Sequence, residues 1–525
     1  MALFRTAAGV VRAIDNRCPH EGYPLATGRL EGDQVTCEWH NWKFRLDNGA
    51  CVLGGEDVRS YPARVTGGEV WIDLAQPAAE RLVPKLLASL DKAFDEDDWS
   101  HAARAVQRLL AAGIAATEIL AHGCDWAARR APFGFDHGLA TSADIAALMA
   151  QFPERADVLI IEALNLLVHP HVRRPERAFL EPVAVAVGHD PEGELRELIE
   201  REDIAGSEAL FRGALALGHG PEAVFSWLVS AATDHFLDYG HAHIYAVKAE
   251  DLLDAIGWNH AHPVLTSLVS SIAYGTREDR LPYMRAYARA MEAHAPRLGG
   301  WATRAPDPGA VLDVDGFLAA ILDGTLPDAL AAVARALDAR VATDRIARAL
   351  ALGAAHRLWR FDATLEDRDD VAEGWLDVTH LLTHADAVHE SERRRPSACT
   401  LRALFHSARF IHHTAVLDAP AHMRPIIPRA GDDLADRLAA TAAQAPGTLP
   451  IFIAHRIKTP LAAIRLWRAL AIDPLFARRA DCALPLVATE RFLAHPIRER
   501  RIARTATNAR TFVTTGKRDR RLLGY

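Results

Sequence analysis

The sequence predicts a multidomain protein in which a small all-β domain is followed by a large all-α domain. With 525 residues, of which 50% are hydrophobic, the chain can bury several cores, and a single core rarely serves more than about 250–300 residues. From about residue 99 onward, Ala, Leu and Arg recur at helical spacing, and alternating β-branched runs are few. We therefore expect a first domain over 1–77, a linker over 78–98 and an α-helical domain over 99–525.

Changes in composition define these boundaries. Pro77 closes the first domain, and the linker, which we expect to be helical, ends in an acidic run at 95–98. Within the helical domain, Pro and Gly cluster at 131–134, 297–310 and 418–432, where breaks are expected. A division into two lobes near 297–310 is one interpretation. No repeat of fixed period is visible, so a solenoid is not predicted.

Charge and cysteine usage exclude several classes of protein. A net charge of −8 and a pI near 6.3 provide no basic field for a nucleic acid, so no nucleic-acid partner is predicted. The chain has no long apolar run and does not begin like a signal peptide, so we expect no membrane span and a cytoplasmic location. Four scattered cysteines are expected to be reduced thiols: Cys51, Cys124, Cys399 and Cys482.

Two Cys/His pairs in the first domain form the most specific motif of the chain. Cys18 and His20 are followed, after sixteen intervening residues, by Cys37 and His40. Two thiolates on one iron and two imidazoles on the other hold a [2Fe-2S] cluster with a potential of about −150 to +300 mV. A closed zinc knuckle is the alternative, although zinc sites usually pair Cys with Cys and His with His. We therefore predict that these four residues hold a cluster that carries single electrons.

The sequence around the pairs resembles the Rieske domains of ring-hydroxylating oxygenases and their ferredoxins. The residues that carry the resemblance are 3–5, 13–15, 18–20, 37–42 and 70–72. The resemblance covers about 1–75 and implies an all-β fold. It also implies the oxygenase or ferredoxin type, because Tyr23 and Trp39 stand where respiratory Rieske proteins have extra cysteines. Asn41 replaces a usual Gly, and the first one or two strands are missing, which leaves the completeness of the N-terminus open.

The catalytic domain that usually follows such a cluster is not recognisable. In the oxygenase family that domain is a mixed α/β fold with the motif Asp-x-x-His-x-x-x-x-His. Asp238 and His241 begin this pattern, but Ala246 stands five residues after His241. The chain also lacks a Gly-x-Gly-x-x-Gly dinucleotide motif, so we expect an external reductase or ferredoxin as the electron donor.

Histidine is abundant in the helical domain, which contains all but two of the 25. A helix over 234–254 would align ionisable side chains with His241 on one stripe: Asp234, Asp238, Tyr245 and Lys248. A helix over 371–394 would place His380 and His384 one turn apart, so that both imidazoles could bind one ion. In both segments a solvated, charge-paired helix face is the alternative.

A third segment, 451–460, embeds His455 and Lys458 in an apolar run, where each is costly without a partner. At this point the helical region resembles the questin-oxidase-like family of non-haem oxygenases, which act on polycyclic aromatic ketones. The resemblance covers about 150–480, and 377–380, Thr383, His455 and Lys458 carry it.

These patterns favour an oxidoreductase in which a Rieske cluster passes electrons to a mononuclear non-haem iron in the helical domain. The candidate residues of this second metal site are His241, His380, His384 and Lys458, with Lys248 close by. The iron would catalyse the O₂-dependent oxidation of a small organic substrate, a class that includes aromatic compounds. The alternative is a non-catalytic electron-transfer protein whose helical domain docks a partner.

Overall fold

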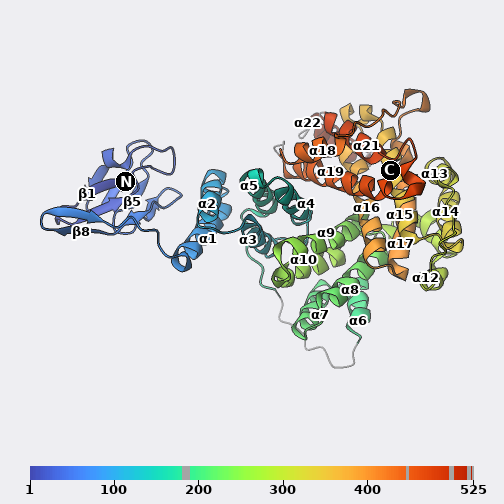
Figure 1. Cartoon of the computed structure of the whole chain (residues 1–525), viewed down its shortest axis with the longest axis horizontal. Helices are drawn as coiled ribbons and strands as arrows, with labels where there is room; N and C mark the ends of the chain where they lie inside the picture. Colours follow the sequence, from blue (N-terminus) through green and yellow to red (C-terminus); the bar gives the residue numbers. More distant parts are fainter. Residues whose placement is uncertain (180–189, 445–448, 496–501, 517–521, 523–525) are drawn as a thin grey trace. The chain divides into compact units, whose positions relative to one another are not determined.

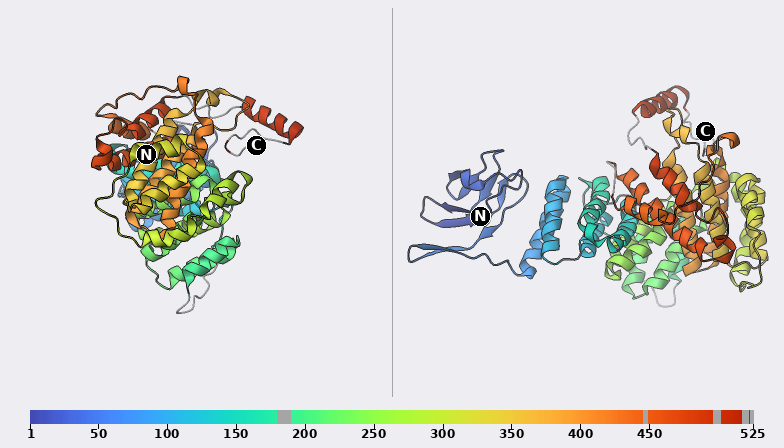
Figure 2. Two further views of the ribbon diagram at one scale, coloured as in Figure 1. Left: turned by 90° about the vertical axis from the view of Figure 1, so that its right-hand side faces the viewer. Right: turned by 45° about the horizontal axis from the view of Figure 1, so that its top comes forward.

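The computed structural model describes residues 1–179, 190–444, 449–495, 502–516 and 522. Residue contacts divide the chain into two compact units, Met1–Ile119 and Leu120–Tyr525. Figures 1 and 2 show β-strands in the first unit and stacked helices in the second. The described residues therefore confirm a small β domain followed by a large helical region.

Short antiparallel strands make up the first part of the chain. They form three sheets, with the strand orders β1-β2-β7, β3-β4-β5-β6 and β8-β9. The strands are β1 (Ala2–Arg5), β2 (Val11–Ile14), β3 (Arg29–Glu31), β4 (Gln34–Thr36), β5 (Lys43–Arg45), β6 (Cys51–Leu53), β7 (Ser60–Tyr61), β8 (Ala63–Thr66) and β9 (Glu69–Ile72). In β1 the side chains alternate, so that Phe4 is buried and Leu3 is exposed, as a period of two residues requires.

Two helices belong to the same compact unit as these strands. The predicted linker forms α1 (Ala79–Glu96), and α2 (Trp99–Ala111) packs against it. The buried carboxylate of Glu56, in the β part, accepts a hydrogen bond from Arg104 Nε at 2.6 Å and pairs with Arg108, both on α2. Since these contacts join α2 to the strands, the compact unit ends later than the boundary predicted at residue 77.

Helices make up the described part of the second unit, and α3 (Ala116–Ala128) crosses the boundary between the units. No strand follows Ile72 in the described ranges, and none of the described helices is both long and apolar enough to cross a membrane. The helices are α4 (His137–Gln151), α5 (Ala156–Val168), α6 (Pro191–Glu200), α7 (Ile204–Ala216), α8 (Pro221–Asp234), α9 (His241–Ile256), α10 (Ala261–Tyr274), α11 (Arg285–Met291), α12 (Leu298–Ala302), α13 (Val314–Asp323), α14 (Leu326–Asp338), α15 (Thr343–Arg360), α16 (Trp375–Arg394), α17 (Ala398–His413), α18 (Leu434–Ala442), α19 (Pro450–Ala471), α20 (Pro474–Ala477), α21 (Leu484–Ala494) and α22 (Ile502–Thr515).

One hydrophobic core runs across the segment where we considered a division into lobes. It contains Trp301 from within 297–310 and large side chains from both sides, such as Phe236 and Phe410. The contacts accordingly place 120–525 in one compact unit.

Four helices of this unit surround a common space. The helix α4 packs against α9 and α19, and α16 packs against the same two helices. The side chains of α16 are buried around most of its circumference from Trp375 to Glu392, so its histidines do not lie on a solvated face. This ring of helices positions the second site described below.

The segment 234–254 is not the single helix that its periodicity predicts. The helix α8 ends at Asp234, a 3₁₀ turn covers Asp238–Gly240, and α9 begins at His241. Asp238, Tyr239 and Gly240 have positive φ angles of 45°, 58° and 85°, which a right-handed helix does not contain. The predicted stripe is therefore broken, and His241 stands in the first turn of a new helix.

Candidate redox and metal sites

The two Cys/His loops of the β domain have the same backbone geometry. In the first, the Cys18 N–H donates to the Tyr23 carbonyl, and the Gly22 N–H donates back to the Cys18 carbonyl. In the second, Cys37 N–H donates to the Trp42 carbonyl and Asn41 N–H to the Cys37 carbonyl. Gly22 and Asn41 occupy the matching left-handed position, with φ of 75° and 60°. Because Asn tolerates this conformation better than most residues, it can replace the usual Gly.

The side chains of these loops separate thiols from imidazoles. Cys18 and Cys37 are buried, and burial, together with the neighbouring Cys37 thiol, raises the pKa of the Cys18 thiol to about 11. His20 and His40 are exposed, with ring centroids 4.4 Å apart. His20 also stacks on Trp42 at 5.0 Å. Paired thiols inside and paired imidazoles at the surface fit a two-iron cluster with one iron bound by each pair.

Comparison with known proteins agrees with this geometry, because residues 1–62 match the Rieske [2Fe-2S] domain family. The N-terminal β domain is a Rieske domain. The chain is 36% identical over 89 residues to a 4beta-methylsterol monooxygenase from Methylococcus capsulatus, a match that covers 15% of this chain and 24% of that protein. It is 40% identical over 84 residues to the iron–sulfur subunit TsaM1 of a toluene-4-sulfonate monooxygenase system from Comamonas testosteroni, covering 14% and 24%.

These similarities are local. The chain spans about a quarter or less of the length of the relatives it matches, including 15% of the oxidoreductase NdmD from Pseudomonas putida. No solved structure matches the chain. The case for a site in the helical unit therefore rests on the geometry of its own residues.

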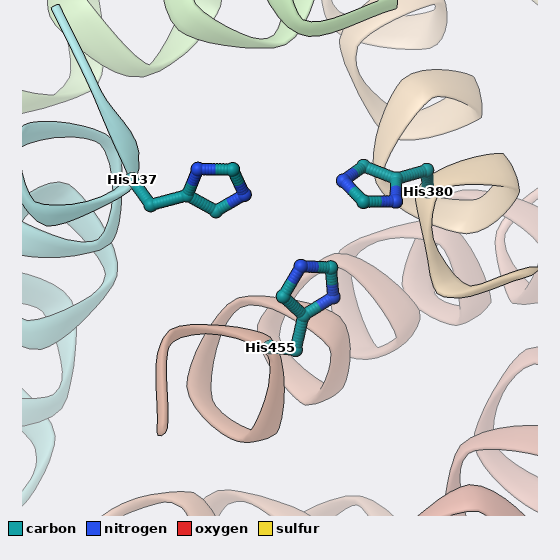
Figure 3. A group of neighbouring side chains, drawn as sticks. All are labelled: His137, His380 and His455. Atoms are coloured by element: carbon teal, nitrogen blue, oxygen red, sulfur yellow. The ribbon is translucent and has the colours of Figure 1, made fainter. Parts of the chain in front are cut away.

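Three histidines from three helices converge in the helical unit (Figure 3). His137 begins α4, His380 lies on α16 and His455 lies on α19; each offers one ligand atom, and these atoms lie within 4.8 Å of one another. Two of these rings also keep a buried nitrogen that faces this point without a hydrogen bond to any described residue: Nε2 of His137 and Nε2 of His455. Buried polar atoms without partners are costly, so a metal ion at this point fits the donor set.

His241, on α9, adds a fourth imidazole to this group. Its Nε2 lies 2.9 Å from Nε2 of His380, and its ring centroid lies 4.8 Å from that of His137. Two nitrogens that bind one ion at right angles, each at about 2.1 Å, would lie about 3.0 Å apart. The alternative is a direct N–H···N hydrogen bond between the two rings. We call His137, His241, His380 and His455 the histidine cluster.

Neighbouring groups fix the protons of two rings in this cluster. The Thr379 hydroxyl donates to the Leu376 carbonyl at 2.9 Å, so it accepts from Nδ1 of His455 at 2.8 Å. Similarly, the Asp238 carbonyl accepts from Nδ1 of His241 at 2.6 Å. Because the proton of each neutral ring is on Nδ1, Nε2 of both His455 and His241 carries a lone pair, as a metal ligand must.

A tyrosine hydroxyl contacts the ring of His137. The hydroxyl of Tyr245 lies 2.8 Å from Nδ1 of this histidine. Outer hydrogen bonds of this kind orient metal-binding imidazoles. Burial also lowers the pKa of all four imidazoles, and the nearby charge of Lys458 lowers it further. The cluster is therefore neutral, which is the form that binds a metal.

Lys458 is close enough to the histidine cluster for its charge to act on the imidazoles. It is 2% exposed, and burial lowers its pKa to about 7, with Asp144 as the favourable charge. Lys248 has a different role, because its ammonium binds Asp144 at 2.5 Å. Of the predicted metal-site residues, the structure thus brings together His241, His380 and Lys458.

His384 does not join the cluster. Its ring contacts Phe236 and His243 and lies 2.8 Å from where a Cβ on Gly240 would stand, beside a cavity of about 10 Å³. Such a cavity holds about one water. On an α-helix, the side chains at positions i and i+4 differ by about 40° in direction and by about 6 Å along the helix axis. The two rings of the His-x-x-x-His pair therefore meet different neighbours. His384 instead supports the turn that precedes His241.

Sequence reasoning missed two ligand candidates. The sequence pattern places His455 beside Lys458 without assigning it to the metal, and it does not single out His137. The sequence does contain one signal for His137. Asp136 is an N-cap residue whose carboxylate accepts from Leu139 N–H at 3.1 Å, so His137 occupies the first position of α4.

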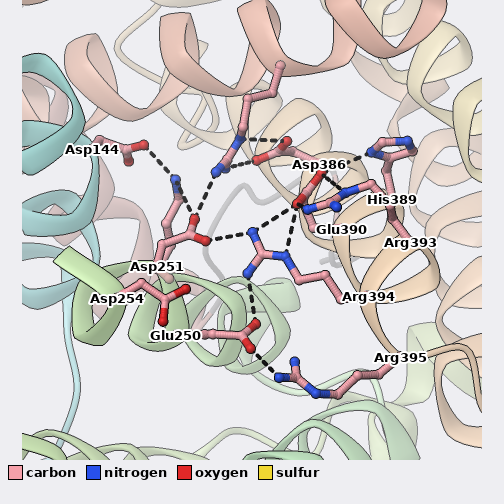
Figure 4. Close-up of polar contacts among 12 residues, drawn as sticks. Asp144, Glu250, Asp251, Asp254, Asp386, His389, Glu390, Arg393, Arg394 and Arg395 are labelled. Atoms are coloured by element: carbon pink, nitrogen blue, oxygen red, sulfur yellow. Dashed lines mark hydrogen bonds and ion pairs between the residues drawn. The ribbon is translucent and has the colours of Figure 1, made fainter. Parts of the chain in front are cut away.

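A network of ion pairs lies farther along the same four helices (Figure 4). Lys248 joins Asp144 to Asp251, and Arg465 joins Asp251 to Asp386. In all, five acidic side chains pair with five basic ones: Asp144, Glu250, Asp251, Asp386 and Glu390 with Lys248, Arg393, Arg394, Arg395 and Arg465. The charges of this network balance without Lys458.

Proposed function

We propose that the chain is a Rieske-dependent oxidoreductase in which a second, mononuclear non-haem iron occupies the histidine cluster. Electrons would enter at the [2Fe-2S] cluster, with Cys18, His20, Cys37 and His40 as its ligands. The iron, bound by His137, His380 and His455 with His241 beside them, would then use these electrons for the O₂-dependent oxidation of a small organic substrate. An external reductase or ferredoxin would supply the electrons, and we expect a cytoplasmic protein.

The observation that carries this proposal is the convergence of neutral, half-buried or buried imidazoles within a chain that also contains a Rieske domain. A Rieske cluster moves single electrons and needs an acceptor. Imidazole ligands suit iron, copper, nickel and zinc, but zinc has no redox chemistry. Relatives of the Rieske domain are named monooxygenases and oxygenase components, which supports iron as the acceptor and O₂ as the oxidant.

The residues of the helical unit would bind and orient the metal. Thr379 and the Asp238 carbonyl hold the proton of His455 and of His241 on Nδ1, which directs Nε2 toward the ion. Burial excludes water from the imidazoles and favours their neutral form. No carboxylate of the described residues belongs to the ligand group, so the ion would keep its full charge.

Metal analysis of the intact protein tests the proposal. Carefully reconstituted wild-type protein should contain three irons per chain, and the His137→Ala/His455→Ala double variant should contain two. The Rieske electron paramagnetic resonance (EPR) signal should be preserved in both proteins. His422→Ala is a matched control, because this histidine is exposed and lies outside the cluster.

Metal analysis can also contradict the proposal. Two irons in the wild-type protein, with no other metal making up the difference, would mean that the imidazoles satisfy one another by hydrogen bonds. The chain would then be an electron-transfer protein with a helical docking region.

A further inference from the structure

Lys458 is a buried lysine that forms no ion pair with the described residues. Only 2% of it is exposed, and among the described residues no carboxylate lies within 4.0 Å of its ammonium. By contrast, Lys248 and Arg465 in the network of ion pairs each bind two carboxylates. A buried ammonium without a partner is strongly disfavoured, and an anion bound beside Lys458 would stabilise its charged form.

Other features of the site also favour negative charge. The group of possible metal ligands in the histidine cluster contains only imidazoles and no carboxylate in the described part of the chain. The helices α4 and α9 begin at His137 and His241, so their partially positive N-terminal ends lie at the cluster. A divalent ion at the histidine cluster, together with the charged form of Lys458, would place several positive charges in a buried space.

We propose that Lys458 binds the ionised oxygen of an organic oxyanion, a carboxylate or phenolate, which is the substrate of this centre. The ammonium would pair with this oxygen while the rest of the substrate lies at the histidine cluster. This inference rests on the proposed function for the identity of the substrate, but anion binding by Lys458 is measurable without turnover.

Calorimetric titration with benzoate tests the role of Lys458, with benzamide as the neutral isostere. Wild-type protein should bind benzoate, and Lys458→Met should bind it about tenfold to hundredfold more weakly, because a hydrogen bond to a charged group is lost. Lys458→Arg should retain most of the affinity, and benzamide should bind the wild type and Lys458→Met equally. Lys85→Met, which removes an exposed lysine, is the matched control.

The Rieske EPR signal and helical circular dichroism report whether each variant folds, and Lys458→Gln replaces Lys458→Met if the latter does not. Benzoate binding that is unchanged in the folded variant would overturn the inference. Formate binding as tightly as benzoate would also overturn the inference, because the site would then recognise a small anion and not an organic substrate. A ¹³C signal from a lysine carbamate in wild-type protein supplied with ¹³C-bicarbonate, absent in Lys458→Met, would equally overturn it.

The titrations should be run on both zinc-loaded and metal-free protein. If no metal binds but benzoate binding depends on Lys458, the proposed function fails and the anion site stands. If metal binds and benzoate binding does not depend on Lys458, the anion site fails and the metal centre stands.

Discussion

The hydroxyl of Tyr245 provides the most direct test of how the histidine cluster is held. It lies 2.8 Å from Nδ1 of His137, and the fully buried Thr379 makes the corresponding contact with His455, also at 2.8 Å. Replacing either residue by its isostere, in Tyr245→Phe or Thr379→Val, removes one outer hydrogen bond and leaves the ligand in place. Loss of such a bond typically weakens metal binding about tenfold to hundredfold, which is about 1.4–2.7 kcal/mol.

Competition with a chelator would measure these affinities for Fe(II) in the intact protein. Each single variant should lose about tenfold to hundredfold in affinity, while the Rieske EPR signal stays the same. Tyr274→Phe, which removes the hydroxyl of a tyrosine with 48% exposure, should bind metal like the wild type. If both single variants also bind like the wild type, the two hydroxyls do not orient metal ligands and the reasoning about the proton positions is refuted.

Two further predictions concern the cluster ligands and the stability of the helical unit. His40→Cys should keep a [2Fe-2S] cluster at a lower potential, because thiolate donates more charge than imidazole; an unchanged EPR spectrum and potential would contradict the ligand assignment. Burial raises the pKa of Glu392 from 4.5 to about 7, so the stability linked to its neutral form is present below about pH 4.5 and is lost as the pH rises through about 7. Glu392→Gln should therefore gain up to about 3 kcal/mol over the wild type between about pH 5 and 8 in urea unfolding followed by circular dichroism, and a difference that stays constant with pH would contradict this.

The Rieske domain could be predicted because its geometry is local. In each loop the backbone of the cysteine forms hydrogen bonds with residues four and five positions later, so residues close in sequence determine the conformation of the loop. The matching positions of Gly22 and Asn41 also follow from this pattern, since each must adopt a positive φ. The number and type of ligands are then visible in a stretch of about twenty residues.

The site in the helical unit could be predicted only in part, because its geometry depends on tertiary packing. His241 and His380 are 139 residues apart, and Tyr245 and His137 are 108 apart. Helical periodicity placed His380 and His384 on one face, but α16 is surrounded by other helices, so each of its faces meets a different neighbour. Periodicity also could not show that Asp238, Tyr239 and Gly240 interrupt the helix before His241.

The order of residues along the four helices explains how such a site can be both neutral and rigid. Asp144 and Lys248 each lie seven residues after the histidine of their helix, Asp386 lies six after His380, and Arg465 lies ten after His455. At 1.5 Å per residue, the ion pairs lie about 9–15 Å farther along each helix than the imidazoles. The charged layer can therefore join the four helices without supplying a carboxylate to the metal. Lys458 is three residues after His455, so it lies between the imidazoles and the charged layer. Lys248 and Arg465 are paired within the charged layer. Among these three cations, and as far as the described residues show, only Lys458 is left for a ligand at the histidine cluster.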